Sequence, residues 1–172
     1  MSHIVLRCPR CGRTRPADMA TNVCRDCAAP LDVEYLDDHK TGGESDSYEA
    51  RTPVHNTSSG VSLGEGGTPC VHLKAVGENL SMRHLHGKLE FLNPTGSFKD
   101  RGTAVMISVA MDHGVTELVE DSSGNAGASV SAYAARAGIK AHVFVPADAP
   151  QVFRTGEREH GRDQHPYGHH EA

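Results

Sequence analysis

The second half of the chain alternates short apolar stretches with longer segments rich in small residues, and this alternation restricts the fold more than any other feature. Periodicity and flanking glycines predict strands at residues 87–92, 116–121 and 140–145 and helices at residues 97–113 and 124–138. This order predicts an α/β fold with a doubly wound parallel sheet and right-handed crossovers. Because three strands make a small open sheet, we expect the sheet to be incomplete.

Four of the five cysteines form two close pairs, Cys8 with Cys11 and Cys24 with Cys27, separated by twelve residues. Two sulfurs at this spacing can bind one metal ion. The N-terminal residues lack the apolar core of a secretory signal, so metal ligation is a better interpretation than disulfides. We therefore predict a zinc-ribbon-like β module over residues 1–36 with a structural zinc. The alternative is a set of reduced thiols without metal.

Length and charge restrict the classes of function that fit this chain. The 172 residues suffice for one ordinary domain or for a domain with a small module. A formal net charge of -5 disfavours a nucleic-acid binder, which needs clustered Lys and Arg. No apolar run approaches the length of a membrane span. We expect a cytoplasmic protein without membrane or nucleic-acid partners, and a homo-oligomer remains open.

Two segments have a composition that does not predict regular structure. Residues 37–60 are polar and have no periodicity, which predicts a linker. Residues 151–172 contain few apolar side chains, so we expect a disordered tail without a further helix or strand. Before the first predicted strand, Gly64, Gly66 and Gly67 imply a backbone pressed against another segment, or else a mobile turn.

Two loops carry the candidate chemistry, NPTGSFKD before the first helix and DSSGNAG before the second. They should meet at the carboxyl ends of the strands, where open α/β sheets bind ligands, and both lead into helix N-termini that attract anions. A neutral amine at Lys99 could attack a carbonyl and form a Schiff base. The Asn125 amide could donate to an oxygen anion on a ring, and Ser122 and Ser123 add hydroxyl donors. Alone, each motif also fits a solvated lysine or a capping turn.

Three stretches, LGEGGTP, LEFLNPTGSFKDRG and SSGNAGASVSAYAARAGIKAHVFVP, together are much more specific. In order and spacing they resemble the pyridoxal-phosphate enzymes of fold type II, the tryptophan-synthase β-subunit fold, and most closely the threonine synthases. The resemblance covers about residues 60–150. A zinc-ribbon-like head also occurs in some threonine synthase-like proteins.

The resemblance implies roles for individual residues. Lys99 would form the imine with the pyridoxal 5'-phosphate aldehyde and later shuttle protons, and Asn125 would hydrogen-bond the ring hydroxyl oxygen of the cofactor. The implied reaction is that of a lyase in threonine biosynthesis, which converts O-phosphohomoserine, an amino-acid substrate, and water to threonine and phosphate. The substrate carboxylate would lie on the loop formed by Ser122, Ser123, Gly124, Asn125, Ala126 and Gly127.

The resemblance also implies parts that the sequence does not show. In this family the glycine-rich cradle for the cofactor phosphate lies well downstream of the Asn loop, and no glycine-rich run follows residue 150. We therefore expect residues 61–150 to be a partial catalytic domain, truncated and followed by a non-family tail, and the activity of the chain stays open. The alternatives are a non-catalytic remnant with a structural zinc ribbon, or another fold type II enzyme such as a serine/threonine dehydratase.

Overall fold

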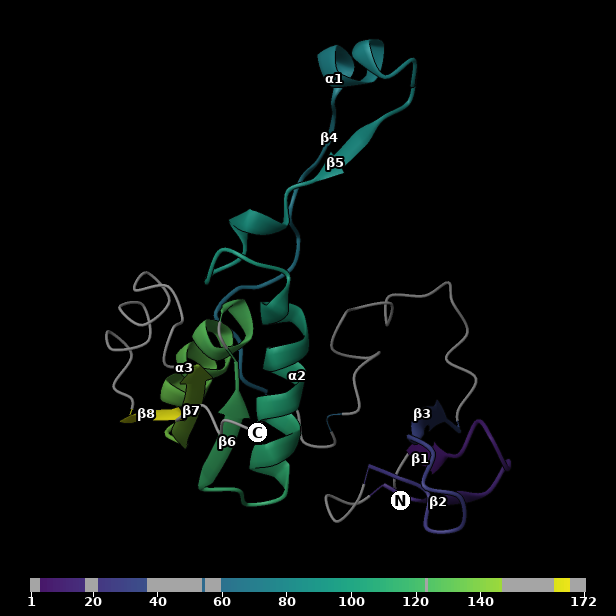
Figure 1. Cartoon of the computed structure of the whole chain (residues 1–172), viewed down its shortest axis with the longest axis vertical. Helices are drawn as coiled ribbons and strands as arrows, with labels where there is room; N and C mark the ends of the chain where they lie inside the picture. The colour runs from purple at the N-terminus through teal and green to yellow at the C-terminus, as the bar shows by residue number, and fades with distance from the viewer. Residues whose placement is uncertain are drawn as a thin grey trace, which may run out of the picture.

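The computed structural model describes residues 4–17, 22–36, 54, 60–122 and 124–146, and the backbone of residues 163–167 (Figure 1). Most of the predicted linker and most of the predicted tail lie outside these residues. The elements in chain order are β1 (Ile4–Arg7), β2 (Thr14–Pro16), β3 (Asp32–Tyr35), β4 (Cys70–His72), α1 (Lys74–Asn79), β5 (His86–Lys88), the 3-10 helix η3 (Glu90–Leu92), α2 (Lys99–Asp112), β6 (Glu117–Asp121), α3 (Asn125–Ala137), β7 (Lys140–Pro146) and β8 (Asp163–Tyr167).

The N-terminal residues form a small antiparallel sheet in the order β2-β1-β3. The central strand β1 places Leu6 opposite Arg15 on one side and opposite Val33 on the other. The turn between β1 and β2 contains the first cysteine pair, and an antiparallel bridge from Val23 to Pro30 encloses the second. A small β sheet is therefore present, with each cysteine pair in a tight reversal of the chain.

The parallel sheet has the order β6-β7-β8, and α3 connects its first two strands. The predicted strands at residues 116–121 and 140–145 are confirmed as β6 and β7. β7 is the central strand of the three, and its residues alternate between buried and half-buried positions, with Val143 and Val145 buried. This alternation fits a strand that has one face more deeply covered than the other, and α3 packs on β7.

The predicted strand at residues 87–92 is wrong. β5 covers only His86–Lys88 and pairs antiparallel with β4 in a separate two-stranded sheet, so it is no part of the parallel sheet. The chain then turns through η3, where Leu92 N–H donates to Leu89 O over 3.0 Å. A short apolar run does not distinguish a strand from such a turn. Figure 1 shows β4, α1 and β5 as an arm (residues 70–88) that points away from the parallel sheet.

A strand was also missed. No strand was expected after residue 150, yet β8 at Asp163–Tyr167 pairs parallel with β7 in the register Val143 opposite Gln164. The stretch DQHPY lacks the β-branched residues and the alternation that indicate a strand. Its proline is also atypical of strand interiors and fits the edge position that β8 occupies among the described strands. Sequence pattern alone therefore gave no signal here.

Both predicted helices are confirmed as α2 and α3, which pack side by side (Figure 1). α3 ends as predicted at Gly138, whose positive φ of 72° is accessible to glycine at little cost. Ile107 of α2 and Tyr133 of α3 are both fully buried in the core. The buried core cluster contains Val61, Ala104, Ile107, Ala110, Ala132, Tyr133, Ala134, Ile139 and Ala141.

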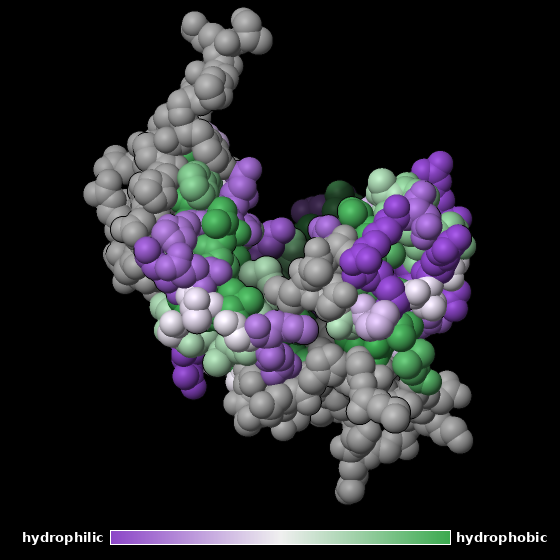
Figure 2. Space-filling model, turned by 90° about the horizontal axis from the view of Figure 1, so that it is seen from below, coloured by the Kyte–Doolittle hydropathy of each residue, from purple (hydrophilic) through white to green (hydrophobic). Residues whose placement is uncertain are grey.

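The surface retains large apolar side chains. Val119 on β6 is 67% exposed, and Phe91 and Phe98 near the first loop are 64% and 58% exposed. Figure 2 shows apolar residues interspersed with hydrophilic ones on the face seen from below. Among the described helices, none has the length and apolarity that crossing a membrane requires.

Replacing Ile107 by alanine tests the core between α2 and α3. The side chain is 0% exposed, so the change leaves a cavity and should lower the free energy of unfolding by about 2–5 kcal/mol. Met106→Ala is the matched control on the same helix, because Met106 is 44% exposed, and it should change that free energy by less than about 0.5 kcal/mol. Urea denaturation measures both, and equal losses would contradict the assigned core.

Candidate active site and cysteine cluster

Lys99 is the first residue of α2, and its side chain is exposed. Its N–H donates to Ser97 Oγ over 3.3 Å, and its ammonium lies 5.1 Å from the centre of the Phe98 ring. Burial raises the pKa of Glu120 near the carboxyl end of β6, Asp121 raises it further, and the positive charge of Lys99 acts in the opposite direction. The Lys99 amine is thus within electrostatic reach of the carboxyl end of β6, as the loop argument predicted.

The second loop is ordered by Ser122. Its N–H donates to Phe144 O over 3.0 Å, which continues the pairing of β6 with β7. Its Oγ accepts the N–H groups of Gly124 and Gly127 over 3.2 and 2.9 Å. The hydroxyl predicted to face substrate therefore stabilises the turn into α3, and the Gly127 N–H is already in use. Ser123 lies outside the described residues.

Asn125 is the first residue of α3 and is exposed, and Ala126 follows it half-buried. Ser129, one turn further along α3, donates to Asp100 Oδ1 over 2.7 Å. Because this bond joins the first turn of α2 to α3, the structure brings Lys99 and Asn125 to neighbouring ends of two packed helices. An amine and an amide so placed can act on one small ligand between the helix N-termini.

Glu90 was not predicted from the sequence, yet its carboxylate accepts hydrogen bonds from three residues near Lys99. Arg101 donates to both carboxylate oxygens of Glu90, Nε over 2.7 Å and Nη2 over 2.8 Å. Thr68 Oγ1 donates to the same carboxylate over 2.7 Å, and Asn93 Nδ2 over 3.0 Å. Arg101, then Thr68 and Asn93, hold the pKa of Glu90 down at about 2. The pair Asp100-Arg101 after Lys99 was the one sequence signal for this contact. It did not indicate that Arg101 binds Glu90.

The glycine-rich loop at residues 64–67 lies against this group. Gly66 N–H donates to Asn93 Oδ1 over 3.0 Å, and a Cβ on Gly66 would lie 3.4 Å from Arg101 Nη1. Glu65 accepts the Tyr133 hydroxyl of α3 over 2.7 Å. Gly66 has a positive φ of 85°, which explains the residue type. The expected pressing of this backbone against another segment is confirmed at Gly66.

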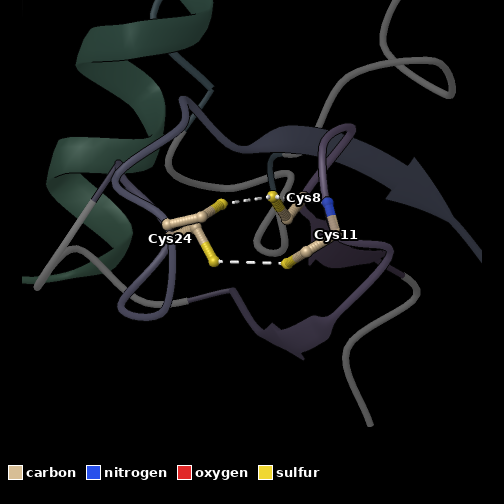
Figure 3. Close-up of side chains that lie close together, drawn as sticks. Cys8, Cys11 and Cys24 are labelled. Carbon is tan, nitrogen blue, oxygen red and sulfur yellow. Dashed lines mark hydrogen bonds between the residues drawn. The ribbon is translucent and has the colours of Figure 1, made fainter.

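The sulfur atoms of all four paired cysteines lie within 4.8 Å of one another (Figure 3). Cys8 Sγ is 3.5 Å from Cys27 Sγ, and Cys11 Sγ is 3.6 Å from Cys24 Sγ. A tetrahedral zinc with Zn–S bonds of about 2.3 Å places its sulfurs roughly 3.8 Å apart, so the cluster fits that ion. Cys70 lies on β4 in the arm and is not in the cluster.

Matching backbone turns hold the two cysteine pairs. Gly12 N–H donates to Cys8 O and Ala28 N–H donates to Cys24 O, each over 2.9 Å. Cys11 N–H donates to Cys8 Sγ over 3.4 Å, and this donor is the main cause that lowers the pKa of the Cys8 thiol to about 6. The thiolate is the form that binds metal, so this donor suits a metal ligand at Cys8. At Cys11 the Arg13 N–H also lowers the pKa, but the Cys8 thiol and burial outweigh it and raise the pKa to about 11.

Comparison with known proteins identifies the class of this chain. A family profile described as "Pyridoxal-phosphate dependent enzyme" matches residues 61–171. This match covers more than half of the sequence, so the chain belongs to that family. The match continues past residue 150, where the sequence resemblance was expected to end.

Individual relatives narrow the resemblance further. The threonine synthase of Methanosarcina acetivorans is 35% identical over 151 residues, covering 83% of this chain and 37% of the relative. That of Methanocaldococcus jannaschii is 36% identical over 151 residues, with 81% and 37% covered. That of Mycobacterium tuberculosis is 45% identical over 103 residues, with 58% and 28% covered. The predicted resemblance to threonine synthases is confirmed, and the chain spans about 37% of the length of the first two relatives.

Solved structures support the fold. A pyridoxal 5'-phosphate-dependent aspartate racemase superposes with a TM-score of 0.55 at 32% identity, covering 58% of this chain and 32% of that one. A processed threonine deaminase isoform 2 from Solanum lycopersicum gives 0.53 at 24% identity, covering 59% and 28%. The second likeness shows the fold alone. The α/β fold predicted from the alternation of elements is confirmed, and so is its likeness to the fold type II enzymes.

The contacts of Glu90 predict an acid-sensitive part of the stability. Its folded pKa of about 2 lies below the usual 4.5, so its contribution is present above about pH 4.5 and is lost as pH falls towards 2. Glu90→Gln should flatten the pH dependence of the free energy of unfolding in that range. The control is Glu78→Gln, because Glu78 forms only a loose, exposed pair with Lys74 at 3.9 Å in the described structure. Urea titrations at several pH values measure both, and identical profiles for Glu90→Gln and wild type would refute the assignment.

Proposed function

We propose that this chain carries the cofactor lysine of a threonine synthase-like lyase, and that Lys99 is that lysine. The supporting observation is the position of Lys99 at the first residue of α2, next to the N-terminal part of α3 and within reach of the end of β6. Family membership supports the cofactor, and the threonine synthases among the relatives support the substrate class.

The residues present fit pyridoxal 5'-phosphate by their chemistry. An exposed amine at Lys99 can bind an aldehyde, and the exposed amide of Asn125 can donate to a ring oxygen. When bound, the cofactor supplies an electron sink for the carbons of the substrate. The helix dipole favours anionic groups at both helix N-termini. The first N–H groups of α2 and the Gly127 N–H of α3 already donate within the protein, so the dipole rather than these donors would attract an anion.

In the proposed reaction, O-phosphohomoserine and water give threonine and phosphate. Lys99 would take a proton from one substrate carbon and return it to another, because an amine next to the reacting carbons can act as base and then as acid. The backbone from Ser122 to Gly127 would bind the substrate carboxylate. For Gly127 this requires release of the N–H that now donates to Ser122 Oγ.

Cofactor loading at Lys99 tests the proposal directly. The chain is incubated with pyridoxal 5'-phosphate, reduced with borohydride and mapped by peptide mass spectrometry. We expect most of the label on Lys99 and its loss in Lys99→Ala. Lys74→Ala is the matched control, because Lys74 is also the first residue of a helix and is exposed, but it lies on the arm. Label spread evenly over the lysines would refute the proposed site.

The loaded chain before reduction separates the alternatives for the substrate. O-phosphohomoserine should change the visible absorbance of the loaded chain at lower concentration than L-threonine or L-aspartate. A preference for L-threonine would favour a dehydratase. A preference for L-aspartate would favour the activity named for the racemase structure. A chain that takes no label at Lys99 would fit a non-catalytic remnant.

We propose further that Cys8, Cys11, Cys24 and Cys27 bind one structural zinc ion. The support is the mutual distance of the four sulfurs, all within 4.8 Å. Residues 1–36 contain five Arg and four acidic residues, a formal charge of +1. Because nucleic-acid binding needs clustered positive charge, a structural role is favoured. The ion would join β1, β2 and the second cysteine turn, where the described part of the module has few buried apolar side chains.

Metal analysis of purified protein tests the zinc site. We expect about one zinc per chain, because four thiolates complete a tetrahedral site. Cys24→Ser should abolish stoichiometric zinc, whereas Cys70→Ser should leave it unchanged, since Cys70 lies outside the cluster. Full zinc content in Cys24→Ser would exclude a four-cysteine site.

A further inference from the structure

The carboxylate of Asp100, the residue directly after Lys99, is fully buried and accepts three hydrogen bonds. Thr95 N–H donates to Oδ2 over 2.7 Å, and the Thr95 hydroxyl donates to Oδ1 over 2.5 Å. The Ser129 hydroxyl donates to Oδ1 over 2.7 Å. A buried carboxylate is tolerated when donors of this kind replace water.

These three bonds join the segments that carry the candidate site. Thr95 lies in the loop that precedes Lys99, and Ser129 lies one turn beyond Asn125 in α3. The first loop and the second helix therefore meet at one side chain. Loss of the Asp100 contacts would leave the loop free to shift relative to α3.

We infer that Asp100 is a positioning residue, which sets where the Lys99 amine stands relative to the N-terminal end of α3. This inference rests on the proposed function, in which Lys99 and Asn125 act on the same cofactor. Asp100 acts through Lys99, because its buried side chain cannot reach a ligand. Its charge also lies in the first turn of α2, where a negative group is favoured by the helix dipole.

The donor set explains why the residue is an aspartate. Both oxygens accept hydrogen bonds, one from a backbone N–H and the other from two hydroxyls. An asparagine of the same size could keep the Thr95 N–H bond only with its NH2 group towards the two hydroxyls, which would then have to accept instead of donate. It would also lose the negative charge that strengthens all three bonds. Asp100→Asn should therefore disturb the loop despite nearly unchanged volume.

Two serines on α3 provide a matched test. Ser129 and Ser131 are both buried, but the Ser131 hydroxyl donates to Gly127 O within its own helix over 2.7 Å. The readout is the rate at which pyridoxal 5'-phosphate is trapped on Lys99 by reduction. Ser129→Ala and Asp100→Asn should slow this rate about 10-fold, because a small displacement of a reacting group is costly. Ser131→Ala should stay within about two-fold of wild type.

Two conservative substitutions of Thr95, in the loop before Lys99, test whether a hydroxyl at this position is enough to keep the labelling rate. Thr95→Val keeps the shape and the backbone N–H but removes the hydroxyl, so labelling of Lys99 should slow as in Ser129→Ala. Thr95→Ser keeps the hydroxyl that donates to Asp100 and should label at the wild-type rate. Equal labelling rates in Ser129→Ala and Ser131→Ala, or in Thr95→Val and Thr95→Ser, would overturn the inference.

Amide exchange separates this inference from the proposed function. The Thr95 N–H donates directly to Asp100, so its exchange rate reports the contact without any cofactor. It should rise about 10-fold in Ser129→Ala and not in Ser131→Ala. If wild type fails to label Lys99, the proposed cofactor role fails, and this exchange result alone decides the inference. Equal exchange in the two serine variants overturns it.

Discussion

The ion pair between Glu90 and Arg101 binds Thr68, which lies 22 positions before Glu90 and 33 positions before Arg101. Thr68 donates to Glu90 across 22 positions, and Leu89 N–H donates to Pro69 O beside it over 2.9 Å. These bonds close the base of the arm, since residues 70–88 lie between the two contact points. Arg101 then attaches this base to α2. With both partners only partly exposed, the paired charges are screened less than on the open surface.

Helix geometry explains the order Lys-Asp-Arg at residues 99–101. Successive residues of an α-helix point about 100° apart, so three neighbours face three directions. Lys99 faces outward, Asp100 is buried and bonded to Ser129 of α3, and Arg101 lies on Glu90. The acid and the base thus secure the first turn of α2 on two sides. Lys99 therefore has a defined backbone position, while its side chain is exposed to solvent.

Elements with strong local patterns were predictable from the sequence. The helices α2 and α3 and the strands β6 and β7 follow from periodicity and from the stop at Gly138. The strand expected at residues 87–92 was not predictable, because Glu90 binds Arg101, Asn93 accepts the Gly66 N–H, and the chain turns there. β8 was missed because its pairing with β7 depends on the sheet, and its own residues give no strand pattern.

Some residues of the candidate site could likewise be predicted from local sequence, and others could not. The cysteine cluster was predictable because the spacing of each pair is local. The proposal for Lys99 likewise rests on a local motif. Glu65 and Tyr133 were not predictable, because their bond spans 68 positions. The second loop is fixed mostly by its own Ser122, whereas the loop before Lys99 depends on Ser129 and on the Glu90 contacts. Substitutions remote in sequence should therefore affect the position of Lys99 more than that of Asn125.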